Sequence, residues 1–159
     1  MNQQSKMFDS AEIVELSELS QPVAHEVSQD NSDLSHFVHE HAISYAGRHL
    51  IIDLYGGRNL DKIEVVGATL REAVVAAGAT LLNLDLHHFA ENNGVSGVAV
   101  LAESHMSIHT WPEAGYAALD IFVCGDCDPY RVLPILKAAF QPEHIQINEL
   151  KRGILPTNR

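Results

Sequence analysis

Residues 101–127 of this 159-residue chain read LAESHMSIHTWPEAGYAALDIFVCGDC, and they include almost every residue type that is useful for chemistry. Glu103 and Ser104 place a carboxylate and a hydroxyl at the end of an apolar run. His105 and His109 follow within a few residues. We therefore expect the reactive site of the protein in this segment.

The second half of the segment predicts a β-strand. Trp111-Pro112-Glu113 is typical of a rigid turn, and residues 116–123 then form a strand that ends at Cys124 in a Gly-Asp loop. Successive residues of a strand point to opposite faces, so one face is apolar and suited to packing under helices. The other face carries Ala118, Asp120, Phe122 and Cys124.

Five further strands are predicted around this one, at residues 48–54, 80–88, 95–102, 106–110 and 144–149. In the strand at 80–88, alternation places one set of side chains on a common face, namely Thr80, Leu82, Leu84 and Leu86. The strand at 95–102 is apolar on both faces, which indicates that both are covered. Helices cover one side, and a second subunit's sheet is a candidate for the other.

Two helices are predicted by apolar residues at helical spacing. The first has Asn59 as its N-cap and ends at Gly78, and Gly67 weakens its pattern slightly. Its inner stripe consists of Ile63, Val66, Leu70, Ala73, Val74 and Ala77. The second begins with Asp128 and Pro129 as N-cap and first residue, and its inner stripe is Leu133, Leu136 and Phe140. Pro134 is expected to remove a backbone hydrogen bond and bend this helix.

The order of these elements predicts an α+β fold. One strand and one helix precede four successive strands, and a helix and a last strand follow. This order favours a two-layer α/β sandwich, in which one mostly antiparallel sheet carries both helices on one face.

Composition and charge exclude several classes of protein. The chain is 46% hydrophobic and carries a net charge of −11, but residues 1–44 alone hold eight acidic residues and one basic residue. Residues 45–159 are only mildly acidic, and no basic stripe predicts nucleic-acid binding. No apolar run approaches the roughly 20 residues of a membrane helix, and the N-terminus lacks the apolar core of a secretory signal. We expect a cytoplasmic protein.

The chain divides into a polar N-terminal part and a folded domain. Residues 1–44 predict a disordered or loosely attached acidic extension, and residues 45–159 the domain. His36, His39 and His41 lie together in the extension. They form either a metal site or polar residues of a solvated arm, and we favour the arm because it offers no rigid scaffold.

The motif A-E-S-H-M-S-I-H-T-W-P-E-x-G-Y-A-A-L-D-I-F-x-C-G-D resembles the processing segment of prokaryotic, short-class S-adenosylmethionine decarboxylase proenzymes. The resemblance extends over residues 47–153. It implies the two-layer fold described above and a homodimer in which the bare sheet faces meet. It also implies a covalent pyruvoyl cofactor that forms a Schiff base with the substrate amine.

Decarboxylation of an amino acid needs an electron sink, which side chains lack. The four lysines lie outside the chemically rich stretch, and the chain has no Gly-rich phosphate loop for pyridoxal phosphate. A serine can supply the sink instead. The Ser104 hydroxyl attacks the Glu103 carbonyl to form an ester, and loss of the Ser104 Hα then breaks the chain. The products are a β chain, 1–103, and an α chain, 104–159, that begins with the pyruvoyl group.

The resemblance also assigns the other site residues. His109 is implied to remove the Hα during processing, and Ser96 to stabilise the tetrahedral intermediate. Cys124 is implied to be the proton donor in decarboxylation. Glu113 is implied to bind the substrate ribose, and Phe89 to lie near the adenosyl group. Because Ser104 and His109 have opposite parity along one strand, we predict a turn near Ser104. This mechanism needs no metal.

One other interpretation is a pyruvoyl-dependent decarboxylase of ornithine or arginine. A second is a homologue without activity that regulates a paralogous partner. A third is a non-catalytic metal- or thiol-binding module built from His36, His39, His41, Cys124 and Cys127. Cys124 and Cys127 also form a C-x-x-C pair, typical of redox or zinc sites, but no second pair accompanies it. We favour S-adenosylmethionine as the substrate and spermidine synthesis as the role.

Overall fold

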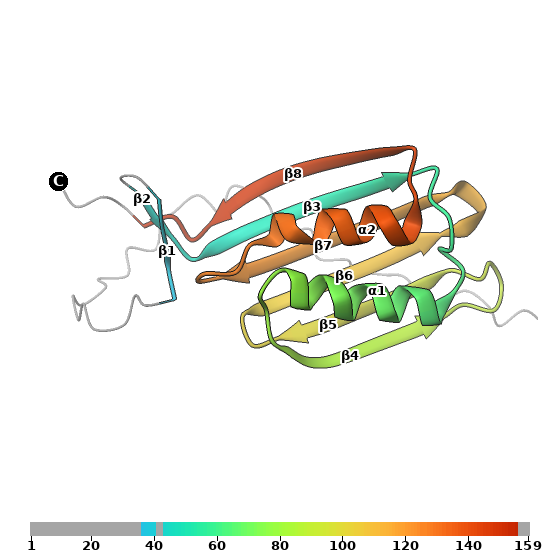
Figure 1. Cartoon of the computed structure of the whole chain (residues 1–159), viewed down its shortest axis with the longest axis horizontal. Helices are drawn as coiled ribbons and strands as arrows, with labels where there is room; N and C mark the ends of the chain where they lie inside the picture. The colour runs from blue at the N-terminus through green and yellow to red at the C-terminus, as the bar shows by residue number, and fades with distance from the viewer. Residues whose placement is uncertain (1–35, 41–42, 156–159) are drawn as a thin grey trace, which may run out of the picture. The chain divides into compact units, whose positions relative to one another are not determined.

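The computed structural model describes residues 36–40 and 43–155 (Figure 1). Two short strands come first, β1 (Val38–Glu40) and β2 (Ile43–Tyr45). The elements that follow are β3 (Gly47–Tyr55), α1 (Ile63–Ala76), β4 (Leu81–His88), β5 (Val95–Leu101), β6 (Ser104–Trp111), the 3₁₀ turn η2 (Pro112–Ala114), β7 (Tyr116–Cys124), the 3₁₀ turn η3 (Pro129–Arg131), α2 (Val132–Phe140) and β8 (His144–Arg152).

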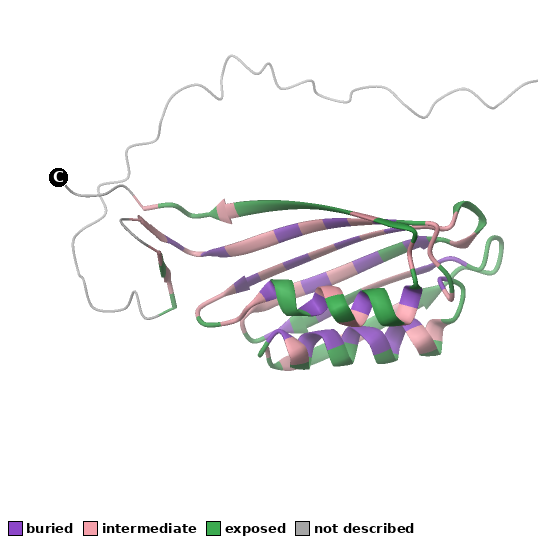
Figure 2. Cartoon of the chain, turned by 45° about the horizontal axis from the view of Figure 1, so that its top comes forward, coloured by how far each residue is buried: buried purple, intermediate pink, exposed green. Residues whose placement is uncertain are grey.

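The main sheet has six strands in the order β4-β5-β6-β7-β3-β8, and every neighbouring pair is antiparallel. Both helices lie on the same face of this sheet (Figures 1 and 2). The predicted α+β class and two-layer architecture are therefore confirmed. Among residues 36–40 and 43–155, no helix lies on the opposite face of the sheet, which we call the bare face.

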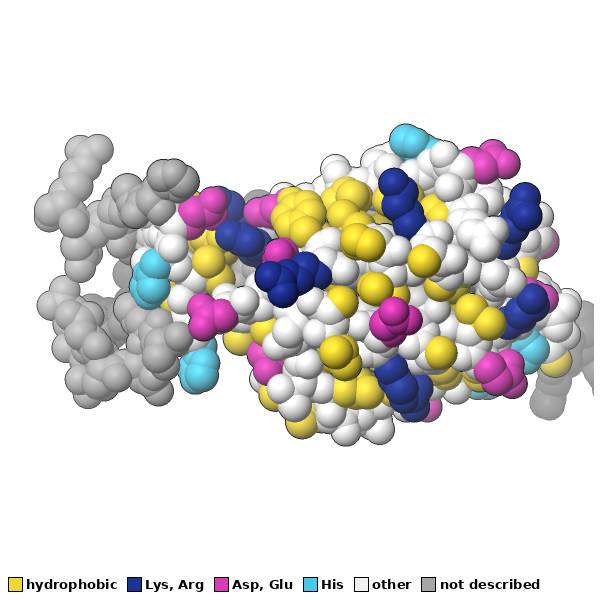
Figure 3. Space-filling model, viewed as in Figure 1, with side chains coloured by type: hydrophobic (Ala, Val, Ile, Leu, Met, Phe, Trp, Pro, Cys, Tyr) yellow, Lys and Arg dark blue, Asp and Glu magenta, His cyan; other side chains and the backbone are white. Residues whose placement is uncertain are grey.

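The core lies between the sheet and the helices. In β7 the predicted alternation holds, because Ala117, Leu119, Ile121 and Val123 are buried under the helices and the residues between them are only partly buried. Leu70 of α1 and Phe140 of α2 are fully buried against the same layer. The outer surface of the helices carries charged side chains of both signs (Figure 3), as expected for a surface in contact with water.

The first helix begins later than predicted. Its N-cap is Lys62, and Asn59 instead lies in the preceding loop at φ 59°. The Asn59 side chain donates a hydrogen bond to the Ala139 carbonyl, 3.0 Å away, and so ties this loop to α2. Gly67 also has a packing role, because a Cβ there would lie 3.0 Å from the Leu86 side chain. The missing side chain lets α1 approach the sheet closely.

The strand at 80–88 differs from its predicted alternation. A register shift between Leu81 and Asn83 interrupts the β4–β5 pairing, and it leaves Leu82 63% exposed. Leu81, Leu84 and Leu86 pack against the core instead. The prediction that Leu82 shares a face with Leu84 and Leu86 was wrong, because a bulge inserts one residue and reverses the parity on one side of it.

The second helix also starts later than predicted. Asp128 caps η3, accepting a hydrogen bond from the Tyr130 backbone N–H, and α2 proper begins at Val132. Pro134 therefore lies in the first turn of α2. The N–H groups of a first turn have no partner inside the helix, so the expected loss of a hydrogen bond at Pro134 does not arise.

The described structure begins before residue 45, where sequence analysis placed the domain boundary. Strands β1 and β2 form an antiparallel hairpin. Glu40 joins this hairpin to β8, since its carboxylate lies 2.7 Å from Lys151 Nζ and accepts a hydrogen bond from the Tyr45 hydroxyl. Residues 1–35 of the predicted extension lie outside the described residues.

The bare face exposes several large apolar side chains. Val98, Val100, Trp111 and Leu150 are each 38–53% exposed there. Val98 and Val100 are alternate residues of β5, whereas Trp111 lies on β6 and Leu150 on β8. Several large apolar side chains exposed on one face of a sheet make that face a candidate for contact with another molecule. None of the helices in the described ranges is long and apolar enough to cross a lipid bilayer.

Candidate active site

Ser104 stands at a tight turn between two strands. Leu101 pairs with Ser104 across the β5–β6 hairpin, which leaves Ala102 and Glu103 as the turn residues. The turn predicted near Ser104 is thus confirmed. Ser104 has φ 148°, a backbone conformation that residues with side chains rarely adopt. The peptide bond between Glu103 and Ser104 therefore lies in a strained segment.

Hydrogen bonds hold both the backbone carbonyl and the side-chain carboxylate of Glu103 in place. Its carbonyl oxygen accepts a hydrogen bond from the Cys124 backbone N–H, 3.3 Å away at the end of β7. Its side-chain carboxylate accepts one from the Thr80 backbone N–H at 2.8 Å. Burial raises the pKa of the Glu103 carboxyl, but the backbone hydrogen bonds outweigh this effect and lower it overall. The carbonyl group that Ser104 would attack is therefore fixed and polarised by a donor.

A polar cluster lies beside Ser104 on the bare face. The Ser104 hydroxyl is 3.1 Å from Nδ1 of His105, and Nε2 of His105 is 3.2 Å from an Asp120 carboxylate oxygen. The same oxygen lies 2.9 Å from Nε2 of His49, and Ser107 donates a hydrogen bond to the other oxygen. Within the described residues, His49, His105 and Asp120 are the one group that could also hold a metal ion.

The surroundings of Asp120 favour its ionised form. Burial raises its pKa, but the hydrogen bonds from Ser107 and His49 and the proximity of His105 outweigh that effect, so the pKa is lowered. Sequence analysis placed Asp120 on the site face without a role and did not single out His49. The contacts of His49 and Asp120 follow from the register of the strands. Ser107 pairs with Asp120, and His49 pairs with Phe122, two residues further along β7.

The predicted processing pair lies elsewhere on the bare face. Ser96 of β5 pairs directly with His109 of β6, and its hydroxyl is 2.9 Å from Nδ1 of His109. The two side chains line a shallow pocket of 240 Å³, together with Asp85, His87, Gly97, Val98 and Ser107. A side chain at Gly97 would force a shift there, because its Cβ would lie 2.2 Å from the Leu86 side chain and 2.8 Å from the Asp85 carbonyl oxygen.

The predicted catalytic residues therefore form two groups rather than one. Ser104 and Cys124 lie at one end of β6, and we call them, with Glu103, the cleavage half-site. Ser96 and His109 form the histidine half-site. His109 lies five positions after Ser104 along β6. At about 3.3 Å per residue, this spacing puts the two residues about 16 Å apart. Within one chain these groups cannot react with each other.

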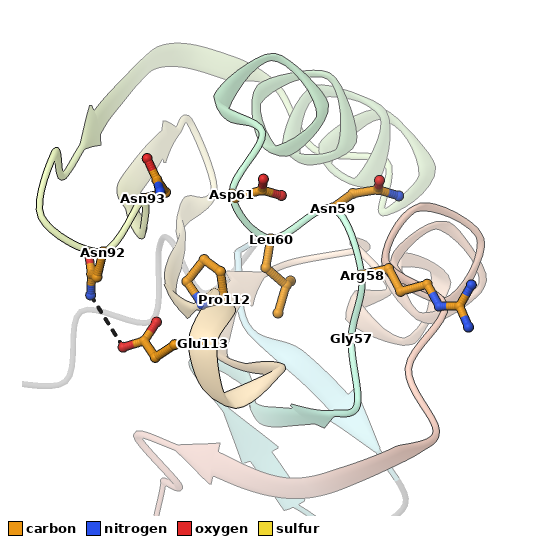
Figure 4. A pocket seen from close by; sticks show the side chains of 9 residues that line it. All are labelled: Gly57, Arg58, Asn59, Leu60, Asp61, Asn92, Asn93, Pro112 and Glu113. Carbon is orange, nitrogen blue, oxygen red and sulfur yellow. Dashed lines mark hydrogen bonds between the residues drawn. The ribbon is translucent and has the colours of Figure 1, made fainter.

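The two predicted substrate-binding residues lie near the histidine half-site. Glu113 is in η2, directly after β6, and it borders a pocket of 470 Å³ that is also lined by Asn92 and Asn93 (Figure 4). Its carboxylate accepts a hydrogen bond from Asn92, 3.4 Å away. Phe89 is 40% exposed and packs edge-on against the His87 ring, with the ring centroids 4.6 Å apart. Ser104 lies at the other end of β6.

The two cysteines have different surroundings. Cys124 is partly buried on the bare face, next to Glu103. Cys127 packs against the core instead and donates a hydrogen bond to the Gly78 carbonyl. Burial raises the pKa of the Cys127 thiol, and nearby acidic groups add to the shift. Of the three clustered histidines, His39 is hydrogen-bonded to Ser44, and His41 lies outside the described residues.

Comparisons with known proteins agree on one family. The model of the S-adenosylmethionine decarboxylase family matches residues 48–153. The chain is 44% identical to the S-adenosylmethionine decarboxylase proenzyme of Thermomicrobium roseum, over 69% of this chain and 95% of that one. It is 46% identical to the proenzyme of the same name from Methanococcus maripaludis strain C7, over 69% and 91% of the two chains.

A solved structure is similar as well. The crystal structure of the adenosylmethionine decarboxylase from Aquifex aeolicus VF5 superposes with a TM-score of 0.63 at 36% identity, covering 71% of this chain and 95% of that one. Fold, motif and sequence similarity thus agree over the same part of the chain. The protein belongs to the S-adenosylmethionine decarboxylase family.

Proposed function

We propose that this protein is a self-cleaving decarboxylase that removes CO2 from S-adenosylmethionine and thereby supplies polyamine synthesis in the cytoplasm. Membership of the family supports the reaction and substrate. The observation that carries self-cleavage is the Glu103–Ser104 peptide. It combines a positive φ at Ser104 with a carbonyl oxygen held by the Cys124 backbone N–H.

Cleavage converts this strained peptide into two chains, 1–103 and 104–159. The Ser104 oxygen attacks the Glu103 carbonyl carbon, and the Cys124 N–H stabilises the negative charge that develops on the carbonyl oxygen. Collapse of the tetrahedral intermediate breaks the C–N bond and leaves an ester. Removal of the Ser104 Hα by His109 of a second copy then expels the Glu103 carboxylate and leaves dehydroalanine at residue 104. Hydrolysis of its imine form releases ammonia and leaves a pyruvoyl group on the shorter chain.

The residues around Ser104 fit this group. A pyruvoyl group supplies an electron sink for the carboxyl carbon of a bound amino acid. Cys124 lies at the same end of β6 as Ser104, on the bare face, where its thiol can return a proton to the substrate α-carbon.

We further propose that each active site combines residues from two copies of the chain. The cleavage half-site and the histidine half-site of one chain lie about 16 Å apart by strand geometry. In a two-fold dimer, a contact between residue i of one copy and residue j of the other occurs twice. If bare faces meet so that the cleavage half-site of one copy covers the histidine half-site of the other, two complete sites result.

The apolar character of the bare face supports this pairing, because a second copy would remove Val98, Val100 and Trp111 from water. Substrate recognition follows from the same pairing. Glu113 and Phe89 lie with the histidine half-site, so the partner copy would offer a carboxylate for the ribose hydroxyls and an aromatic ring for the adenosyl group. This arrangement favours a nucleoside substrate over ornithine or arginine.

The experiment that tests the proposed function is an intact-mass measurement of the purified protein. We expect two fragments of 103 and 56 residues, with the shorter one blocked to Edman degradation. Ser104→Ala should give one uncut, inactive chain. The processed protein should release CO2 from S-adenosylmethionine and not from ornithine or arginine. An uncut wild-type chain that still decarboxylates S-adenosylmethionine would refute the proposal.

A further inference from the structure

Self-cleavage needs a base for the Ser104 hydroxyl. The histidine half-site of the same chain is too far away to supply it, and His109 of a second copy is already assigned to the Ser104 Hα. Serine hydroxyls become effective nucleophiles when an adjacent base takes their proton. Among the described residues, the His105 ring lies against this hydroxyl, with its Nδ1 3.1 Å from the Ser104 oxygen. This distance is that of a hydrogen bond.

The far side of the His105 ring is held by an acceptor. Nε2 of His105 lies 3.2 Å from an Asp120 carboxylate oxygen. A carboxylate accepts and does not donate, so Nε2 carries the ring proton and Nδ1 presents its lone pair to Ser104. His49 and Ser107 also bond to Asp120 and fix its position on β7. The carboxylate is 23% exposed, so water screens it only partly.

We propose that His105 is the catalytic base that activates Ser104 for self-cleavage, and that Asp120 is the positioning residue that orients its ring. This inference rests on the proposed function, because it assumes cleavage between Glu103 and Ser104. The order of groups, carboxylate to imidazole to hydroxyl, matches the logic of serine-hydrolase triads. Here the nucleophile and its base are neighbours in the sequence.

His105 Nδ1 takes the Ser104 hydroxyl proton while the oxygen forms a bond to the Glu103 carbonyl carbon. The electron pair of the carbonyl moves to its oxygen, next to the Cys124 N–H. When the C–N bond breaks, the His105 imidazolium returns the proton to the departing Ser104 nitrogen. The products are an ester, a free amine and a neutral imidazole, and no outside reactant is consumed.

The test measures how fast freshly translated precursor is cut, in buffer that contains EDTA. His105→Ala should be cleaved about 100-fold or more slowly than wild type. Added imidazole should raise the cleavage rate of this variant about tenfold. Asp120→Asn should also be slow, and the double variant should cleave within about threefold of His105→Ala alone, because the two residues act as a unit. His144→Ala is the matched control, an exposed strand histidine beside Tyr55 at the other end of the sheet.

A second measurement identifies the step. Hydroxylamine cuts esters under mild conditions and leaves ordinary amides intact, apart from Asn-Gly bonds such as Asn93-Gly94, so the fragment masses must identify the bond that is cut. The uncut His109→Ala chain should be cut by hydroxylamine between residues 103 and 104, because it stops after the ester forms. The uncut His105→Ala chain should resist hydroxylamine, because the ester does not form.

Several results would overturn the inference. These are cleavage of His105→Ala within about threefold of wild type, absence of imidazole rescue, and hydroxylamine sensitivity equal to that of His109→Ala. Loss of cleavage in EDTA with recovery on adding Zn²⁺ would mean that His49, His105 and Asp120 bind a metal instead. Cleavage of Ser104→Ala would refute the proposed function itself, whereas rapid cleavage of His105→Ala alone would refute only this inference.

Discussion

At the scale of single residues, backbone conformation and backbone hydrogen bonds distinguish Ser104 from other serines. Ser104 differs from an ordinary strand serine because its φ is 148° and because the preceding carbonyl accepts a hydrogen bond from Cys124. The motif pointed to Ser104 and Cys124, and the opposite parity of Ser104 and His109 predicted the turn near Ser104. It did not predict a role for His49 or Asp120, because their contacts depend on the register of three strands.

The two cysteines give a matched pair of variants. Cys124→Ser should still be cleaved, since the backbone N–H at this position is kept, but the rate of decarboxylation should fall roughly 10²–10⁴-fold because the proton donor is lost. Cys127→Ser should retain the wild-type rate, because Cys127 packs against the core. Turnover of S-adenosylmethionine by the processed enzymes measures both. Equal rates for Cys124→Ser and wild type would contradict the assigned role.

At the scale of elements, alternation and helical spacing predicted six strands and two helices of the described structure. The details that differ depend on contacts between distant parts of the chain. Leu82 leaves the predicted face at a bulge, and Asn59 leaves the predicted cap because it bonds to the Ala139 carbonyl. Local sequence patterns do not contain such tertiary contacts, so neither could be predicted.

Close packing between β4 and β5 makes Gly97 sensitive to substitution. An added Cβ would lie 2.2 Å from the Leu86 side chain and 2.8 Å from the Asp85 carbonyl oxygen, so one strand must shift. Gly97→Ala should lower the free energy of unfolding by about 1–3 kcal/mol. Chemical denaturation measures this loss. Val75→Ala, at a side chain 75% exposed on α1, should change stability by less than about 0.5 kcal/mol. Equal effects of the two variants would contradict the packing argument.

The β1–β2 hairpin should lose its attachment in acid. Hydrogen bonds from Lys151 and Tyr45 lower the pKa of Glu40 from 4.5 to about 2. A lowered folded-state pKa means that the contribution to stability is present above pH 4.5 and is lost as the pH falls toward 2. The difference in melting temperature between wild type and Glu40→Gln should therefore shrink over this range.

The control for that experiment is Glu72→Gln, which replaces an exposed glutamate of α1. Its effect on the melting temperature should vary less with pH than that of Glu40→Gln. A Glu40→Gln difference that stays constant from pH 5 to pH 2 would show that the ionised carboxylate does not hold the hairpin.

At the scale of the whole molecule, the bare face connects the fold to the chemistry. Helices cover one face of the sheet, and the other face carries both half-sites and exposed apolar side chains. Sequence parity already placed Ser104 and His109 on opposite faces of a straight strand. In the structure a turn at Ser104 interrupts the regular alternation of faces. Ser104 and His109 nevertheless lie toward opposite ends of β6.

The most direct test of this account is cleavage in mixed dimers that carry two different affinity tags. Ser104→Ala and His109→Ala should each stay uncut alone. Co-expressed and purified through both tags, the His109→Ala copy should be cut between residues 103 and 104, because its partner supplies His109. A wild-type copy paired with the Ser104→Ala/His109→Ala double variant should stay whole. If intact mass shows instead that this wild-type copy is cut, and that the His109→Ala copy of the first pair is not, the active site lies within one chain and the account is contradicted.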